Sequence, residues 1–299
     1  MIRVLSLGVG VQSSTLLLMS VKGVLPKLDA AVFADPGWES LKTYDYLEYL
    51  KPIAEAAGIK IVVGSYGNIR TDAITCQVGW DRTTRTIGSR WASMPLFVLN
   101  PDGSGGMVNR QCTSRYKIGV INRQVKAMMV EAGLAQRRKT KRGVWVVRVP
   151  RNSGILVEKW IGISYDEIHR RSKPESQWLT HRYPLIQDMS RRTLQLYPVG
   201  YTRDNCIEWL AENGYRIPPR SACIGCPFHS DAEWISIKTE SPDEFEDACQ
   251  FDEAIRNFGG MRGHMFLHSS RVPLREVLFK PGKGGMGLAH EECMGMCGN

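Results

Sequence analysis

The sequence lacks long hydrophobic runs and has few cysteines, and each of these shortages excludes a class of protein. No stretch approaches the ~20 consecutive apolar residues of a membrane span, and the N-terminus leads into a strand-like pattern instead of a signal peptide. Eight cysteines among 299 residues are too few for a disulfide-stapled secreted domain. We therefore expect a soluble, cytoplasmic protein that does not engage membranes.

One segment also lacks acidic residues. Between Leu134 and Val157 there is none, and the strand-like residues 143–149 within it predict a basic hairpin or loop. The basic residues there are Arg137, Arg138, Lys139, Lys141, Arg142, Arg148 and Arg151. Two interpretations stay open for this segment, a solvated surface turn and a phosphate-binding element. The whole chain carries 39 Lys and Arg against 30 Asp and Glu, a net charge of +9, which favours nucleotides or nucleic acid as partners unless it serves solubility alone.

The first sixty residues alternate between short apolar runs and helical patterns. Strands are predicted at 3–7, 30–34 and 59–63, and helices at 13–22 and 41–57. Short apolar runs between helices are typical of buried parallel strands. The sequence therefore predicts an α/β fold with a doubly wound parallel sheet.

Composition shifts divide the rest of the chain. We expect an α/β nucleotide-binding domain at 1–200 with a basic insertion at 134–157, a helical C-x-x-C region at 201–281, and a flexible cysteine-bearing tail at 282–299. Residues 65–109 have no clear period and are predicted to be long loops, followed by a helix at 117–132. The strand pattern restarts at 157–163. Helix starts are predicted at Thr202, at a Ser230/Glu233 capping box, and at Ser241 before Pro242.

Residues 6–14 (SLGVGVQSS) follow the first strand and open a helix. The glycines let the backbone approach an anion, the first amides of the helix point at it, and serine hydroxyls add donors. The segment matches neither G-x-x-x-x-G-K-[ST] nor G-x-G-x-x-G, which argues against an ordinary kinase or dehydrogenase.

The cysteines are clustered, with Cys223 and Cys226 in a C-x-x-C and Cys293 and Cys297 in a C-x-x-x-C. In a reducing compartment this spacing indicates metal ligation or redox chemistry. Zinc on Cys223, Cys226 and His229 together with Cys112 is one possibility, and a metal-free thiol pair is another.

These segments together resemble the PP-loop superfamily of ATP pyrophosphatases and phosphoadenosine phosphosulfate (PAPS) reductases. The similar segments lie in the family's order over about residues 1–240, at 6–14, 33–39 (FADPGWE), 110–113 (RQCT), 162–171 (GISYDEIHRR), 183–185 (YPL) and 221–227 (SACIGCP). The likeness is greatest to PAPS-reductase-like proteins of phages and mobile elements. It implies an adenine nucleotide α-hydrolase-like fold that binds its nucleotide at the carboxyl ends of the strands, in agreement with the rule for open α/β sheets.

The resemblance implies a set of nucleotide-binding residues. They are Ser6, Gly8, Gly10, Gln12, Ser13, Ser14, Asp35, Gly162, Ser164, Asp166, Glu167, Arg170 and Arg171. The ATP pyrophosphatases carry Asp where this chain has Gln12, so magnesium, if used, would need Asp35 or Asp166. Asp35 has a simpler alternative role as a helix cap.

The resemblance also implies a four-iron four-sulfur cluster on Cys112, Cys223 and Cys226, with zinc as the alternative metal. Thr113 stands where the related reductases have a further cysteine, so Cys206 is either a fourth ligand or a core residue.

The C-terminal tail is similar to the Glu-Cys-Gly tail of PAPS reductases, whose cysteine attacks the sulfur of the nucleotide. Cys293 and Cys297 are therefore either catalytic or two thiols on a frayed tail. His264 and His268 either reach the site or are structural.

Two functions follow from this resemblance, and a third follows from the basic residues at 137–151 and from Gln12. The first is reduction of PAPS or its unphosphorylated relative APS, through a thiosulfonate on Cys293 that Cys297 or a thioredoxin-like reductant resolves. The second is an ATP pyrophosphatase-type sulfurtransferase that adenylates and thiolates tRNA or DNA. The third is a nucleic-acid-binding accessory protein with a decayed nucleotide site.

Overall fold

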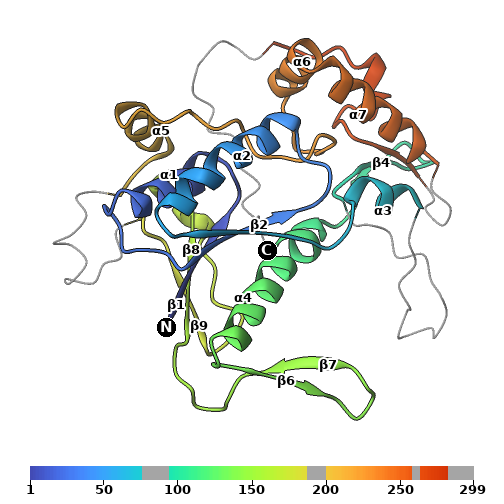
Figure 1. Ribbon diagram of the computed structural model, residues 1–299. Helices are drawn as coiled ribbons and strands as arrows, with labels where there is room; N and C mark the ends of the chain where they lie inside the picture. Colours follow the sequence, from blue (N-terminus) through green and yellow to red (C-terminus); the bar gives the residue numbers. More distant parts are fainter. Residues whose placement is uncertain (76–93, 187–199, 258–262, 282–299) are drawn as a thin grey trace.

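The computed structural model describes residues 1–75, 94–186, 200–257 and 263–281. Its centre is a five-stranded parallel sheet in the order β3-β2-β1-β8-β9 (Figure 1). The strands are β1 (Ile2–Leu7), β2 (Ala30–Asp35), β3 (Lys60–Ser65), β8 (Val157–Ile161) and β9 (Leu179–Arg182). This is a Rossmann-like α/β domain, and it confirms the predicted parallel sheet; β9 was not predicted.

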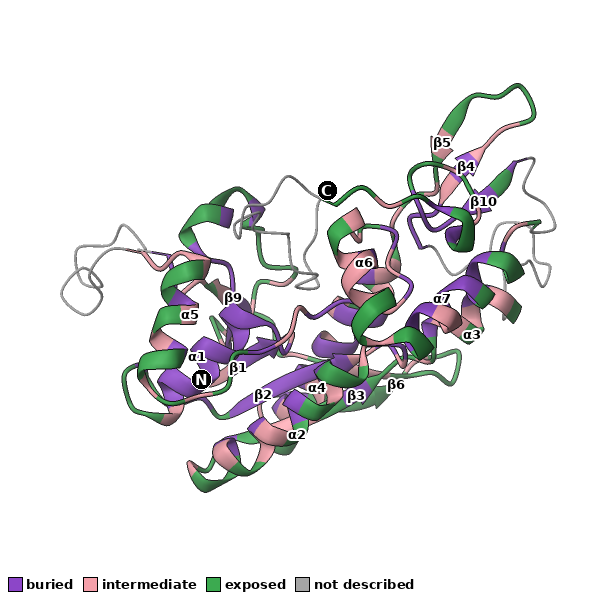
Figure 2. Ribbon diagram, turned by 90° about the horizontal axis from the view of Figure 1, so that it is seen from above, coloured by how far each residue is buried: buried purple, intermediate pink, exposed green. Residues whose placement is uncertain are grey.

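Helices cover both faces of this sheet. On one face, α1 (Val11–Val21), α2 (Leu41–Ala56) and α5 (Arg203–Glu212) form a single apolar core with alternate residues of β1 and β2. On the other face, α4 (Gly119–Glu131) packs on the intervening strand residues. Figure 2 shows the buried residues along β2 and α1. The period-2 alternation of side chains along each strand separates the packing on the two faces. The core on the α1 face is here called the first core.

A second apolar core lies beside the sheet and draws on both halves of the chain. It contains α3 (Ile69–Thr75), α6 (Asp231–Glu240), α7 (Pro242–Ala254), a 3-10 turn (Leu274–Glu276) and a small sheet, with Trp234 fully buried. The small sheet has the order β10-β4-β5 and comprises β4 (Phe97–Leu99), β5 (Gly105–Met107) and β10 (His264–Phe266).

The prediction of long loops over residues 65–109 was therefore wrong for α3, β4 and β5. Each of these elements is too short to display a helical or strand period. Two predicted helix starts are confirmed together with their caps. Thr202 caps α5 by accepting from the amide of Asn205, and Ser230 with Glu233 forms the capping box of α6. Ser241 precedes Pro242 at the start of α7 but gives no side-chain cap.

The predicted basic hairpin is confirmed as β6 (Gln136–Lys139) paired with β7 (Trp145–Arg148). It connects the end of α4 to the start of β8 and so lies at the N-terminal ends of the parallel strands (Figure 1). No described helix is long and apolar enough to span a bilayer.

One buried charge inside the sheet gives a test of this fold. Lys159 of β8 is only 3% exposed, and its ammonium donates to both oxygens of Glu175 at 2.9 and 3.1 Å, while desolvation lowers its pKa. We expect Glu175→Ala to reduce the free energy of unfolding by about 3 kcal/mol, because it leaves a buried ammonium without its carboxylate. Urea denaturation at pH 7 measures this, with the exposed Glu276→Ala as control. Equal stability of the two variants would contradict the prediction.

Candidate functional site

The order of the sheet reverses between β1 and β8. The chain moves outward from β1 to β2 and β3, then returns to place β8 on the other side of β1. In open parallel sheets, ligands bind in the crevice outside the carboxyl ends of the strands at such a reversal. Residues 8–10 leave β1 at this point and residues 162–164 leave β8 there, so two predicted nucleotide-binding segments come together.

The loop of residues 8–10, here called the glycine loop, has an unusual conformation. Val9 has φ +63° although it is β-branched and fully buried, a backbone state that costs such a residue about 1–2 kcal/mol. The Ser13 hydroxyl holds the turn, accepting from the amide of Gly8 at 3.2 Å and donating to the carbonyl of Gly10 at 3.3 Å. Strain of this kind concentrates at ligand-binding sites.

The N-terminus of α1 opens directly from the glycine loop. Its N-cap, Gly10, provides no side-chain cap, and the first turn contains no acidic residue. The positive end of the helix dipole is thus not neutralised by the helix's own side chains, which suits an anion. The Gln12 Oε1 and Ser14 Oγ atoms are buried and have no hydrogen-bond partner among the described residues.

A buried polar network joins the glycine loop to the segment after β8. The Gln12 amide donates to Ser164 Oγ at 3.3 Å and to Glu167 Oε2 at 3.2 Å. Arg170 donates to Glu167 Oε1 at 2.6 Å, within the 3-10 turn Tyr165–Arg170. Arg170, which the resemblance assigns to the nucleotide, is thus buried against a carboxylate, while Arg171 is exposed and lies over the ring of Tyr183 at 5.3 Å.

The two candidate magnesium ligands both accept protein hydrogen bonds. Asp35 Oδ1 accepts from the amide of Gly37 and from the Tyr44 hydroxyl, each at 2.7 Å, and together with burial this contact raises the pKa of Tyr44. Asp166 Oδ1 accepts from the amide of Arg203 at 3.3 Å. Asp35 therefore shapes its own loop, whereas Asp166 joins the turn after β8 to the start of α5.

Three cysteines predicted as metal ligands line one cavity. Cys112, Cys223 and Cys226 surround it together with Arg110 and Lys117, and we call it the thiol cavity. Cys112 immediately precedes a π-helix (Thr113–Ile118) that continues into α4, where an uninterrupted helix was predicted from residue 117. π-helices are rare and occur mostly at functional sites.

The thiol cavity is attached to the sheet through the loop after β2. The Ile224 amide donates to the Trp38 carbonyl at 2.9 Å, and Glu39 forms a β-bridge with Cys223. Any side chain at Gly225 would collide with the Trp38 indole, so this position requires glycine. The C-x-x-C turn therefore lies against the carboxyl end of β2, the strand next to β1.

Sequence reasoning missed Glu39 and Lys117. Glu39 is 2% exposed, and its Oε1 accepts from the Lys117 ammonium at 3.1 Å and lies 3.9 Å from the Cys223 sulfur. A carboxylate and an ammonium are thus buried beside the thiols. The signal in the sequence is weak: Glu39 ends the similar segment 33–39, and Lys117 lies four residues after the similar segment 110–113.

A metal can be tested against this arrangement. Thiolates suit zinc and iron–sulfur clusters, but no three His, Cys, Asp or Glu side chains in the described ranges are arranged to hold an ion. The cavity has about 20 Å³ of space, room for one water. As arranged, these residues do not fit a cluster.

The other predicted ligands lie elsewhere. Cys206 is fully buried in α5 within the first core, whereas Cys112 and Cys223 pack against the second; the structure therefore places Cys206 in the core role that the sequence also allowed. Cys293 and Cys297 lie outside the described residues.

The histidines near the cysteines have structural partners. His229 donates through Nε2 to the Cys223 carbonyl at 3.0 Å, and burial lowers its pKa to about 4, so it is neutral at pH 7. His268 contacts Asp231 and Ser270, and the exposed His264 contacts Asn257.

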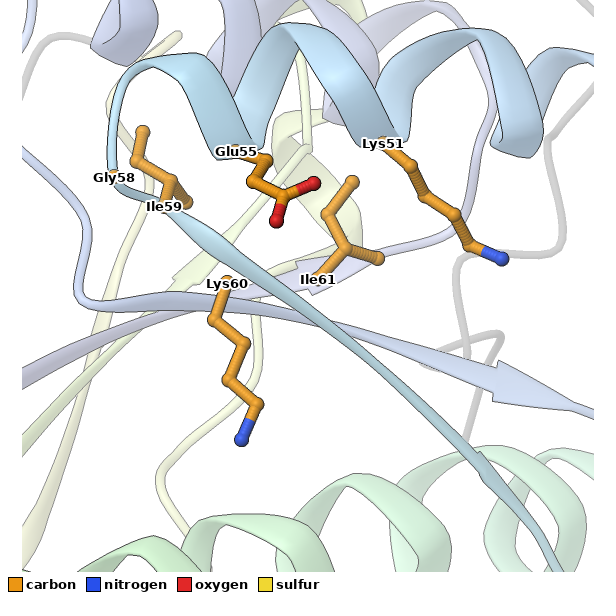
Figure 3. A pocket seen from close by; sticks show the side chains of 6 residues that line it. All are labelled: Lys51, Glu55, Gly58, Ile59, Lys60 and Ile61. Atoms are coloured by element: carbon orange, nitrogen blue, oxygen red, sulfur yellow. The ribbon is translucent and has the colours of Figure 1, made fainter.

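A separate open pocket lies at the opposite end of the sheet. It is lined by residues at the end of α2 and the start of β3, including Lys51, Glu55 and Lys60 (Figure 3). It does not adjoin the carboxyl ends of the strands.

Comparison with known proteins finds no matching family model, curated protein or solved structure.

Metal content of the thiol cavity is directly measurable. The sequence resemblance predicts iron with visible absorption, or zinc without it, whereas the arrangement of the three thiols predicts that protein purified anaerobically carries no bound metal. Bound iron or zinc whose content falls in Cys112→Ala would contradict the prediction from the arrangement. Cys249→Ala is the matched control, because Cys249 is buried in the second core and burial raises its thiol pKa to about 11.

Proposed function

We propose that this protein is a PP-loop enzyme that binds an adenine nucleotide at the glycine loop and performs sulfur chemistry with its cysteines. One observation carries the proposal. An uncapped helix start and a strained loop lie at the sheet reversal, and the C-x-x-C turn that lines the thiol cavity is hydrogen-bonded to the loop after the adjacent strand β2. An anionic nucleotide and a thiol-reactive centre would thus be neighbours.

Among the chemistries open to such a site, we favour reduction of PAPS or APS. The carboxylates near the glycine loop support this choice, because Glu167 is held by Gln12 and Arg170 and Asp35 is held by its own loop. Magnesium-assisted cleavage of ATP needs carboxylates that can turn toward the metal. Transfer of a sulfonate to a thiolate requires only that the leaving phosphate be bound.

The proposed reaction balances without a metal. The Cys293 thiolate attacks the sulfur of the sulfonate, an S–S bond forms, and the adenosine phosphate leaves with the electron pair of the broken S–O bond. A dithiol reductant of the thioredoxin type, or Cys297, then attacks the cysteine sulfur, and sulfite leaves. The reductant ends as a disulfide.

Nucleotide binding can be tested on the loop itself. We expect calorimetry to detect binding of PAPS or AMP, and Ser13→Ala to weaken it about fivefold, the value of one hydrogen bond that shapes the loop. The control is Ser20→Ala, which removes a hydroxyl bonded to Pro26 and Leu28 at the other end of α1. If neither nucleotide binds the wild-type protein, the proposal fails.

The reaction is tested with labelled PAPS and thioredoxin. We expect labelled sulfite from the wild-type protein and from Cys249→Ala, and none from Cys293→Ser, whose nucleotide affinity should be unchanged. Release of AMP and pyrophosphate from ATP in the presence of tRNA or DNA, without sulfite, would establish the sulfurtransferase instead.

A further inference from the structure

The β6–β7 hairpin presents an unpaired set of positive charges. All seven basic residues between Leu134 and Val157 are exposed, and none forms an ion pair with an acidic group of the described residues. The tip is a closed turn in which the amide of Thr140 donates to the carbonyl of Val144 at 2.8 Å, and Gly143 has φ +78°. Four of the cations therefore lie on the paired strands, Lys141 and Arg142 lie in the tip turn, and Arg151 follows β7.

An aromatic ring lies among these charges. Trp145 is 65% exposed, whereas Trp38, Trp160 and Trp234 are at most 4% exposed. It pairs across the hairpin with Lys139, whose ammonium lies 5.9 Å from the centre of the indole ring. An exposed indole flanked by cations suits stacking of a nucleic-acid base whose phosphates meet the cations.

The base of the hairpin is anchored. Ala135 is buried, and Val147 and Val149 pack against the core beneath α4. The strands therefore leave the domain from a fixed support, and the residues near the tip extend into solvent (Figure 1).

The hairpin cannot serve the nucleotide of the glycine loop. It precedes the start of β8, whereas the glycine loop follows the end of β1, and these strands run parallel in direct pairing. Six residues of strand separate the two ends of the sheet by about 20 Å. Any phosphate that these charges bind is therefore not a phosphate of that nucleotide.

We propose that the hairpin binds single-stranded nucleic acid, with backbone phosphates along the basic residues and one unpaired base stacked on Trp145. The proposal does not rest on the adenylate-binding function, since it uses no residue of that site. The stacking ring favours a single strand over a duplex, whose bases are already stacked on one another.

The test uses the full chain and fluorescein-labelled 20-nucleotide single strands of DNA and RNA, with fluorescence anisotropy over a salt series. We expect at least one of the two strands to bind. Trp145→Ala should weaken that binding about 5- to 100-fold, and Trp145→Phe should largely restore it. Lys141→Gln with Arg142→Gln should reduce the slope of log affinity against log salt by about 1.4, two phosphate contacts.

The matched control is Lys238→Gln with Lys280→Gln, which removes the same charge on and beside α6, at the opposite end of the molecule from the hairpin (Figure 1). This control should leave the salt slope unchanged. The proposal is overturned if neither strand binds, if Trp145→Ala binds like the wild type, or if the control lowers affinity as much as the tip variant. The same measurements are made with the corresponding duplex and with anionic phosphatidylserine vesicles. The proposal is also overturned if the duplex binds as tightly as the single strand, or if only the vesicles bind. Nucleotide calorimetry on the Trp145→Ala variant is independent of all these outcomes.

Discussion

The double pairing of β1 is the constraint on which the rest of the structure depends. Its backbone bonds to β2 on one side and to β8 on the other, so both neighbours hold the strand and the turn that leaves it. That support is what allows Val9 to remain in a left-handed conformation. The same pairing brings Ser164 and Glu167 beside the start of α1, although they are more than 150 residues away in the chain.

The thiol cavity depends on a different kind of assembly. Its walls come from the loop after β2, the π-helix before α4 and the C-x-x-C turn before α6, and residues of the second core pack around them. The Glu39–Lys117 pair joins two of these parts where burial makes an uncompensated charge expensive. A polar contact of this kind fixes which surfaces meet, while the apolar packing around Trp38 and Phe251 holds them together.

The sequence was informative where structure is local. Apolar runs and helix periods located β1, β2 and α2, and hydroxyl side chains located the starts of α5 and α6, because strands, helices and caps are determined by near neighbours. The three-residue strand β4 shows no period, and it pairs with β10, a distant segment of the chain. The Glu39–Lys117 contact spans 78 residues, and no local sequence pattern predicts it. The parallel sheet was predictable, whereas the position of the cysteines relative to it was not.

The π-helix that follows Cys112 has a consequence for how the cavity tolerates change. Each residue of a helix turns the chain by about 100°, and the wider turn of residues 113–118 accommodates more chain than a regular helix would. Loss of a single residue there would leave α4 seated on the sheet but swing the Cys112 sulfur round the axis, away from Cys223 and Cys226. In evolution, an insertion or deletion at this turn would bring the Cys112 thiol into the cavity or remove it from the cavity, while the α/β domain stays intact.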